Sequence, residues 1–331
     1  MHGKLGVSPI RTLIAASALS LTLGLVGCSS TTGAALPGSV GGPGGAGSST
    51  AMSNAGAQAP IGAGSPVAVV TSTDVWGSVA AAVGGRFAKV TSLVTDPAAD
   101  PHSFEASAPN QLALSKATVI IRNGGGYDDF MQRMIESSHP KAAVLDAVEI
   151  SGNRGLNGEL NEHVWYDFRA VVKVAQQIRI ALSAADPADA AEFGRNGDAF
   201  IAKVTALQQK EAALKSTSNG AAVAITEAVP LYLLQAAGLV NATPPEFSEA
   251  VESENDAPAS VVAATLALFT GKKVKALVYN EQTTGPQTEQ VLAAARANGV
   301  AIVPVTETLP PGTDYLGWMN ANVDALSAAL R

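Results

Sequence analysis

Short apolar runs alternate with helix-like segments in two separate parts of the chain, and this alternation restricts the fold more than any other feature. The predicted strands cover residues 66–72, 90–94, 118–121 and 142–145 in the first part, and 221–226, 274–279 and 300–305 in the second. Strands that alternate with helices pair in parallel, with the helices on the faces of the sheet. The sequence therefore predicts an α/β protein with two similar lobes, each a parallel sheet flanked by helices.

Between these two parts lies a stretch with helical periodicity and no strand signal. An amphipathic segment runs from 167 to 184, and Asp186-Pro187 then offers an N-cap followed by proline at the first helical position. Apolar residues recur at helical spacing from 187 to about 215. A helix of that length would measure about 42 Å. We expect one long, rigid helix to join the lobes.

The N-terminus has the pattern of an export signal. Lys4 and Arg11 precede an apolar run at 12–26, which is shorter than the ~20 residues of a membrane-spanning helix. The run ends in Leu-Val-Gly-Cys, which resembles a bacterial lipobox, so Cys28 is expected to carry a lipid after removal of residues 1–27. The alternative is a cysteine that lies near a cleavage site by chance. Because Cys28 is the only cysteine, a disulfide framework and a cysteine-rich zinc site are excluded.

Residues 29–65 contain ten glycines and no charged residue. Such a segment buries too little apolar surface to fold, so we expect 28–65 to be a flexible tether between the lipid and the lobes. The remaining chain is predicted to divide into an N-terminal lobe at 66–168, linking helices at 169–216 and a C-terminal lobe at 217–331. A total length of 331 residues agrees with two domains.

The charge and the apolar content of the chain restrict the classes of function that are possible. The chain carries 21 Lys and Arg residues against 28 Asp and Glu residues, a formal net charge of −7. A nucleic-acid-binding protein usually needs a basic face, so we expect no nucleic-acid partner. The apolar fraction of 47% is sufficient for a packed core.

Two histidines and two glutamates occupy comparable loop positions. His102 follows the second predicted strand, and His163 lies where the first lobe ends. Glu227 and Glu307 each follow a predicted strand of the second lobe. Open α/β sheets bind ligands at the carboxyl ends of their strands, so a cleft between the lobes would collect all four side chains. His139, at the end of a predicted helix, is expected to be structural.

Five segments together form a specific signature. They are Asp-Pro-His-Ser-Phe-Glu at 100–105, Asn-Gly-Gly-Gly-Tyr-Asp-Asp-Phe at 123–130, Glu-His-Val-Trp-Tyr-Asp at 162–167, Tyr-Asn-Glu-Gln-Thr-Thr-Gly-Pro-Gln-Thr at 279–288 and Val-Thr-Glu-Thr-Leu-Pro-Pro-Gly at 305–312. With these segments the chain resembles the metal-binding lipoproteins of bacterial ABC importers for zinc and manganese, the cluster A-I or ZnuA/PsaA-like family. The resemblance extends from about residue 67 to residue 330 and implies a periplasmic-binding-protein-like fold of the helical-backbone type.

The resemblance also implies a set of metal ligands. The two histidine ligands of the family fall on His102 and His163, and the third ligand falls on Glu227. The fourth, an acid after the last strand, falls on Glu307, with Glu281 as the alternative because it also follows a strand. The sequence departs from many zinc-specific relatives because it lacks a third histidine ligand and a His/Asp-rich loop.

Two imidazoles and two carboxylates suit a divalent transition metal. Mn²⁺, Zn²⁺ and Fe²⁺ all accept this set of ligands. Bidentate carboxylates favour Mn²⁺, whereas the general order of affinities favours Zn²⁺, so the ligand types do not select one metal. The resemblance implies a monomeric, non-enzymatic protein, anchored by lipid to the outer face of the cell membrane. It would deliver its metal to an ABC transporter permease, and its partners would be this permease and, through the permease, an ATPase subunit.

Two other functions use the same residues. A zinc metallohydrolase would need an open coordination position for water, which four protein ligands leave little room for, and the sequence has no His-Glu-x-x-His segment. A surface adhesin with a structural metal is the second alternative. Adhesion that does not depend on metal would favour it.

We predict that metal affinity decreases as the pH falls from about 7.5 to 5, because only neutral imidazole binds a metal. Calorimetric titration with Zn²⁺ or Mn²⁺ at both pH values measures this. Equal affinity at the two pH values would contradict a site that contains histidine.

Overall fold

The computed structural model describes residues 64–154 and 160–331. The predicted signal sequence at 1–27, the lipidation site Cys28 and nearly all of the predicted tether at 28–65 lie outside the described residues. Within the described part of the chain, no helix is both long enough and apolar enough to cross a membrane.

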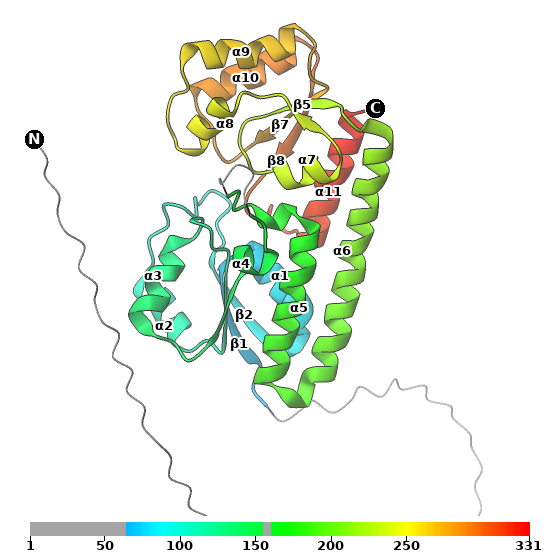
Figure 1. The fold of residues 1–331 in the computed structure, drawn as a ribbon. Coiled ribbons are helices and arrows are strands. Elements are labelled where there is room, and N and C mark those ends of the chain that lie inside the picture. Colours follow the sequence, from blue (N-terminus) through cyan, green and yellow to red (C-terminus); the bar gives the residue numbers. More distant parts are fainter. Residues whose placement is uncertain (1–63, 155–159) are drawn as a thin grey trace, which may run out of the picture. The chain divides into compact units, whose positions relative to one another are not determined.

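The first sheet consists of four parallel strands in the order β2-β1-β3-β4 (Figure 1). The strands are β1 (Val67–Thr73), β2 (Ala88–Val94), β3 (Val119–Arg122) and β4 (Ala143–Asp146). β1 is central, and Val69 pairs with Val90 on one side and with Val119 on the other. Buried β-branched side chains on β1 and β3 explain this sheet, because strands covered on both faces are apolar throughout.

The second sheet repeats the topology of the first. Its order is β6-β5-β7-β8, so that the first strand again pairs with the second and the third. The strands are β5 (Ala222–Ile225), β6 (Val240–Asn241), β7 (Ala276–Asn280) and β8 (Ala301–Val305). The predicted fold class, two parallel sheets flanked by helices, is confirmed. The proposed domain boundaries stay predictions.

Eleven α-helices accompany the two sheets in the described residues. They are α1 (Asp74–Gly84), α2 (Ala108–Ser115), α3 (Asp129–Ser138), α4 (Ala147–Ser151), α5 (Phe168–Ala185), α6 (Ala190–Ser218), α7 (Leu231–Ala236), α8 (Pro245–Glu252), α9 (Ala259–Thr270), α10 (Pro286–Ala297) and α11 (Tyr315–Ala329). The sequence pattern predicts none of α4, α8 and β6. Helices α4 and α8 have only five and eight residues, and β6 has two, so none of them shows a clear period.

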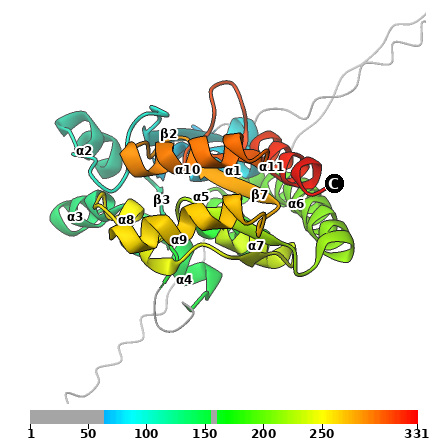
Figure 2. The ribbon, with the colours of Figure 1, turned by 90° about the horizontal axis from the view of Figure 1, so that it is seen from above.

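The predicted long helix is α6, which has 29 residues and extends along both sheets (Figure 1). It packs against α1 and α5 on one part of its length and against α7 and α11 on another. Figure 2 shows α6 and α11 side by side when the molecule is seen from above. One apolar cluster extends from β1 through α5 and α6 to β8 and α11, so the two sheets share a core.

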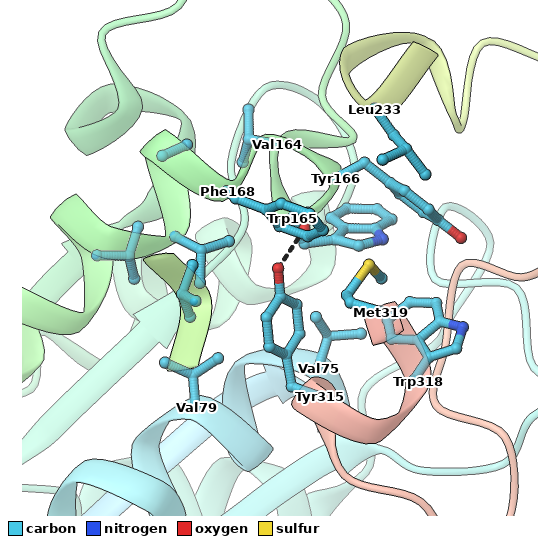
Figure 3. Close-up of a cluster of buried hydrophobic side chains, with 14 of the residues drawn as sticks. Val75, Val79, Val164, Trp165, Tyr166, Phe168, Leu233, Tyr315, Trp318 and Met319 are labelled. Atoms are coloured by element: carbon cyan, nitrogen blue, oxygen red, sulfur yellow. Dashed lines mark hydrogen bonds between the residues drawn. The ribbon is translucent and has the colours of Figure 1, made fainter. Parts of the chain in front are cut away.

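Buried aromatic side chains join the segment at 164–166 to the last helix (Figure 3). The Tyr315 hydroxyl donates a hydrogen bond of 2.7 Å to the backbone carbonyl of Trp165. The Tyr166 hydroxyl donates a hydrogen bond of 2.8 Å to the carbonyl of Thr306, at the end of β8. These two bonds fix the chain next to His163 against Thr306, which precedes Glu307, and against Tyr315 at the start of α11.

Helix α6 carries a buried acid, Glu211, that is not among the candidate metal ligands. Glu211 is 6% exposed, and its Oε1 atom has no hydrogen-bond partner in the described part of the molecule. Burial, together with the charge of Asp167, raises the pKa of Glu211 to about 8. The folded protein therefore holds a proton on Glu211 that the unfolded chain releases above its ordinary pKa of 4.5.

We predict that Glu211→Gln stabilises the protein more at pH 8 than at pH 5. Between the unfolded and folded pKa values the folded state binds more protons, so this group makes the free energy of unfolding decrease as pH rises. Urea denaturation measures the free energy of unfolding of wild type and variant. The variant's gain over wild type should be larger at pH 8 than at pH 5 by more than about 1 kcal/mol. The exposed Glu105→Gln is the control, and a pH-independent effect of Glu211→Gln would contradict the prediction.

Candidate metal centre

The His163 side chain is completely buried and its ring orientation is fixed by Asn161. The Oδ1 atom of Asn161 accepts a hydrogen bond of 3.0 Å from the backbone N–H of His163 and lies 2.7 Å from Nδ1 of the ring. The Nδ2 atom of Asn161 donates a hydrogen bond of 3.0 Å to the carbonyl of Ala228, which settles which end of the amide faces the imidazole. Nδ1 therefore carries a hydrogen, and Nε2 is the atom available to a metal.

Nε2 of His163 points toward two carboxylates and has no hydrogen-bond partner in the residues described. It lies 3.6 Å from Oε1 of Glu252 and 3.8 Å from Oε2 of Glu307. Both separations exceed a normal hydrogen bond. Two ligand atoms that bind one metal ion at about 2.0–2.2 Å lie roughly 3.0–3.5 Å apart, so an ion would fit between these atoms after small movements.

The same carboxylates determine the charge of His163. Burial alone would lower the pKa of the imidazole, but Glu307 and Glu252 outweigh burial and raise that pKa to about 9. At neutral pH this imidazole therefore carries a proton on both nitrogens, and a metal that bound Nε2 would have to displace one of them. The positive charge of His163 in turn holds the pKa of Glu307 below its ordinary value, although burial opposes this.

Glu227 and Glu307 approach each other at the carboxyl ends of β5 and β8. Asn280, the last residue of β7, lies between them, and its Nδ2 atom donates a hydrogen bond to Oε2 of Glu227 and another, of 2.9 Å, to Oε1 of Glu307. Glu227 is only 3% exposed, and its burial and the nearby charge of Glu307 raise its pKa to about 8. Three neighbouring parallel strands thus place two acids and an amide at one edge of the second sheet.

His102 belongs to the loop after β2 and is exposed. Its backbone N–H donates a hydrogen bond of 2.8 Å to Oδ1 of Asp100, the local turn expected of an Asp-Pro-His segment. His102 lines a cavity of about 620 Å³, and Glu227 and Glu307 line the same cavity. The structure therefore brings His102 to the two acids of the second sheet.

Tyr127 packs against both imidazoles. Its buried ring lies edge-on to His102 at 4.9 Å between ring centroids and to His163 at 6.0 Å. The ring of Trp165 lies 4.8 Å from Tyr127 and 5.1 Å from His163. These buried aromatic rings therefore cover one side of the site.

The alternative ligand Glu281 does not face this cavity. Its side chain is exposed, and Glu281 is absent from the residues that line the cavity. The geometry therefore favours Glu307 as the fourth ligand, and the four ligands themselves stay predictions. His139, expected to be structural, is the C-cap of α3 with a left-handed φ of 46°.

Sequence reasoning missed two acids near the site. Glu252 is the last residue of α8, a helix that was not predicted, and its Oε1 is the carboxylate oxygen 3.6 Å from His163. Glu162 immediately precedes His163, and this position in the Glu-His-Val-Trp segment was the available signal. With His102, these two acids form a group of possible metal ligands.

Comparison with known proteins identifies the family and the fold. The family model described as ZnuA, zinc-uptake complex component A, periplasmic, matches residues 69–329. The fold is similar to that of the periplasmic zinc-binding protein TroA from Treponema pallidum, with a TM-score of 0.69 and 21% identity over 81% of this chain and 99% of that chain.

Two curated relatives match part of the sequence. The manganese-binding lipoprotein MntA of Halalkalibacterium halodurans is 28% identical over 44% of this chain and 49% of its own length. The iron-binding protein YfeA of Yersinia pestis is 28% identical over 42% of this chain and 46% of its own length. The chain thus spans about half the length of these relatives.

We predict that metal binding changes the fluorescence of Trp165, because its ring lies 5.1 Å from that of His163. Titration with Zn²⁺ should shift or quench the intrinsic emission in wild type. The change should be lost in Trp165→Phe and retained in Trp318→Phe, a matched substitution on α11. An equal change in both variants would contradict the prediction.

Proposed function

The chain belongs to the family of periplasmic zinc-uptake complex component A proteins, and from this membership we propose that it captures a divalent transition metal ion and delivers it to an ABC importer. The observation that carries the proposal is the buried Nε2 atom of His163, which faces the carboxylates of Glu252 and Glu307 at 3.6 and 3.8 Å. A buried nitrogen that lacks a hydrogen-bond partner in the described structure, with acids at these distances, is the environment that a metal cation completes.

We propose His102, His163, Glu227 and Glu307 as the ligands of the transported ion. His163 and Glu307 provide the best-defined pair, and Asn280 holds Glu227 beside them. His102 would enter the coordination shell from the exposed side of the cavity. The carboxylates neutralise a divalent ion, and the imidazoles add donors without adding charge.

The ligand set admits Mn²⁺, Zn²⁺ and Fe²⁺. MntA and YfeA are named as manganese-binding and iron-binding proteins, and TroA is named as a zinc-binding protein. Carboxylates that bind through two oxygens raise the coordination number and favour Mn²⁺, whereas Zn²⁺ forms the stronger complexes with most nitrogen and oxygen ligands. The proposal is therefore capture of a divalent transition metal as a class.

The N-terminal sequence supports a proposal for export and membrane anchoring. We propose that residues 1–27 direct export, that Cys28 carries the lipid, and that 28–65 tether a monomer to the outer face of the cell membrane. The lipobox-like segment supports this, as does the word lipoprotein in the name of MntA. The partners would be a permease and, through it, an ATPase subunit.

We propose binding rather than catalysis as the activity of the site. Four protein ligands leave little room for the bound water that a hydrolytic metal activates. The raised pKa values of His163 and Glu227 need no catalytic role, because neighbouring carboxylates raise that of His163, and burial and the charge of Glu307 raise that of Glu227.

We predict that His163→Ala and Glu307→Ala each lose stoichiometric metal, whereas His139→Ala retains it. Each site variant removes one member of the His163–Glu307 pair. His139, in contrast, is exposed and caps the C-terminus of α3. Purified proteins are loaded with Zn²⁺ or Mn²⁺, dialysed and measured by elemental mass spectrometry. Circular dichroism checks that each variant folds, and a full equivalent of metal in both folded site variants would contradict the proposed function.

A further inference from the structure

A second set of metal-ligating side chains lies at the exposed side of the proposed site. His102, Glu162 and Glu252 each offer one ligand atom, and these three atoms lie within 4.8 Å of one another. One imidazole and two carboxylates neutralise a divalent transition metal and match its preferred donors. Of these three residues, only His102 belongs to the ligands proposed above.

Exposure decreases from this set toward the proposed inner ligands. His102 is exposed, and Glu162 is half-buried. The side chain of Glu252 is 25% exposed, that of Glu307 is 12% exposed, and that of His163 is completely buried. A cation that enters from solvent therefore meets His102, Glu162 and Glu252 before it meets His163 and Glu307.

Glu252 connects the two sets. One of its carboxylate oxygens belongs to the outer group, and its Oε1 atom lies 3.6 Å from Nε2 of His163. This Nε2 atom is buried and has no hydrogen-bond partner in the described parts of the chain, so the Glu252 carboxylate faces a nitrogen that is free to bind an ion. An ion held by Glu252 could thus reach His163 without leaving its first carboxylate ligand.

Hydrogen bonds link the outer group to the residues around His163. The backbone N–H of Ala228 donates to Oε2 of Glu252 at 3.4 Å, while the carbonyl of Ala228 accepts from Asn161, which orients His163. The carbonyl of Glu162 accepts a hydrogen bond of 3.0 Å from Asn123. The carboxylate of Glu252 is therefore linked through Ala228 to the residue that orients the buried imidazole, and the backbone that precedes His163 is fixed by Asn123.

We propose that His102, Glu162 and Glu252 form an outer metal position, which receives the divalent cation before it moves to His163, Glu227 and Glu307. Glu252 binds the ion in the outer position and passes it to His163. This inference rests on the proposed function and adds an entry step to it. The ligand is the hydrated divalent transition metal ion itself.

The test compares Glu252→Gln and Glu162→Gln with Glu246→Gln in the full mature chain. Glu246 lies on the same helix as Glu252, is exposed and lines neither the cavity that contains His102 nor the cavity that contains Glu162, so its substitution makes the same change in net charge away from the outer position. Stopped-flow measurements follow Trp165 fluorescence after mixing with Zn²⁺ or Mn²⁺ alone. Elemental analysis of dialysed protein then counts the ions that remain bound.

Both outer variants should associate with metal at least about fivefold more slowly than wild type and still retain one tightly bound ion. Glu246→Gln should match wild type in both measurements. Wild-type association rates in the two outer variants would overturn the outer position. Loss of the tightly bound ion in them would also overturn it, because the acids would then belong to a single inner site. A wild-type protein that binds no metal would contradict the proposed function itself.

Discussion

The rest of the site depends on one buried imidazole nitrogen. Leaving a buried polar atom unsatisfied costs about 1–3 kcal/mol, so Nε2 of His163 requires a charge partner when no hydrogen bond reaches it. Asn161 occupies Nδ1, and Ala228 fixes Asn161, which leaves Nε2 directed at Glu307 and Glu252. A proton fills this position in the metal-free protein, and a divalent cation bound to Nε2 and to Glu307 would take its place. The positions of the two acids are thus explained by a single nitrogen.

The carboxylates reach His163 because the two sheets share one core. The apolar cluster is continuous from β1 to α11, and α6 contacts helices that pack on both sheets. Bonds from Tyr315 to Trp165 and from Tyr166 to Thr306 fasten the two sides close to the site. Gln282 adds a further link, since its side chain bonds both Pro97 and Thr308. A wide opening of the cleft would expose this core, so metal release is better explained by local movement of the loops that carry His102 and Gln282.

Much of the fold was predictable because its signals are local. Apolar runs in the sequence predict the strands β1, β3 and β7, and helical spacing over many residues predicts α6. The elements that were missed are short, and one of them has consequences for function. Helix α8 begins at Pro245 after another proline, which is typical of a loop as much as of a helix start, and so Glu252 at its end was not considered. The four proposed ligands came from loop positions and a family resemblance, whereas the distances among them depend on how the sheets pack, which no local pattern contains.

The separation into outer and inner acids also explains how one site can bind strongly and still exchange its ion. A hydrated cation cannot lose all its water in one step without a large cost, since the protein must replace each water by a donor. His102 and the half-buried Glu162 and Glu252 can replace some waters while solvent still reaches the ion. Glu307 and the buried Glu227, held together by Asn280, can then replace others in a drier environment. Because Glu252 is close to both positions, the ion keeps a negatively charged ligand throughout. The same ligands, used in the opposite order, provide a route for its release.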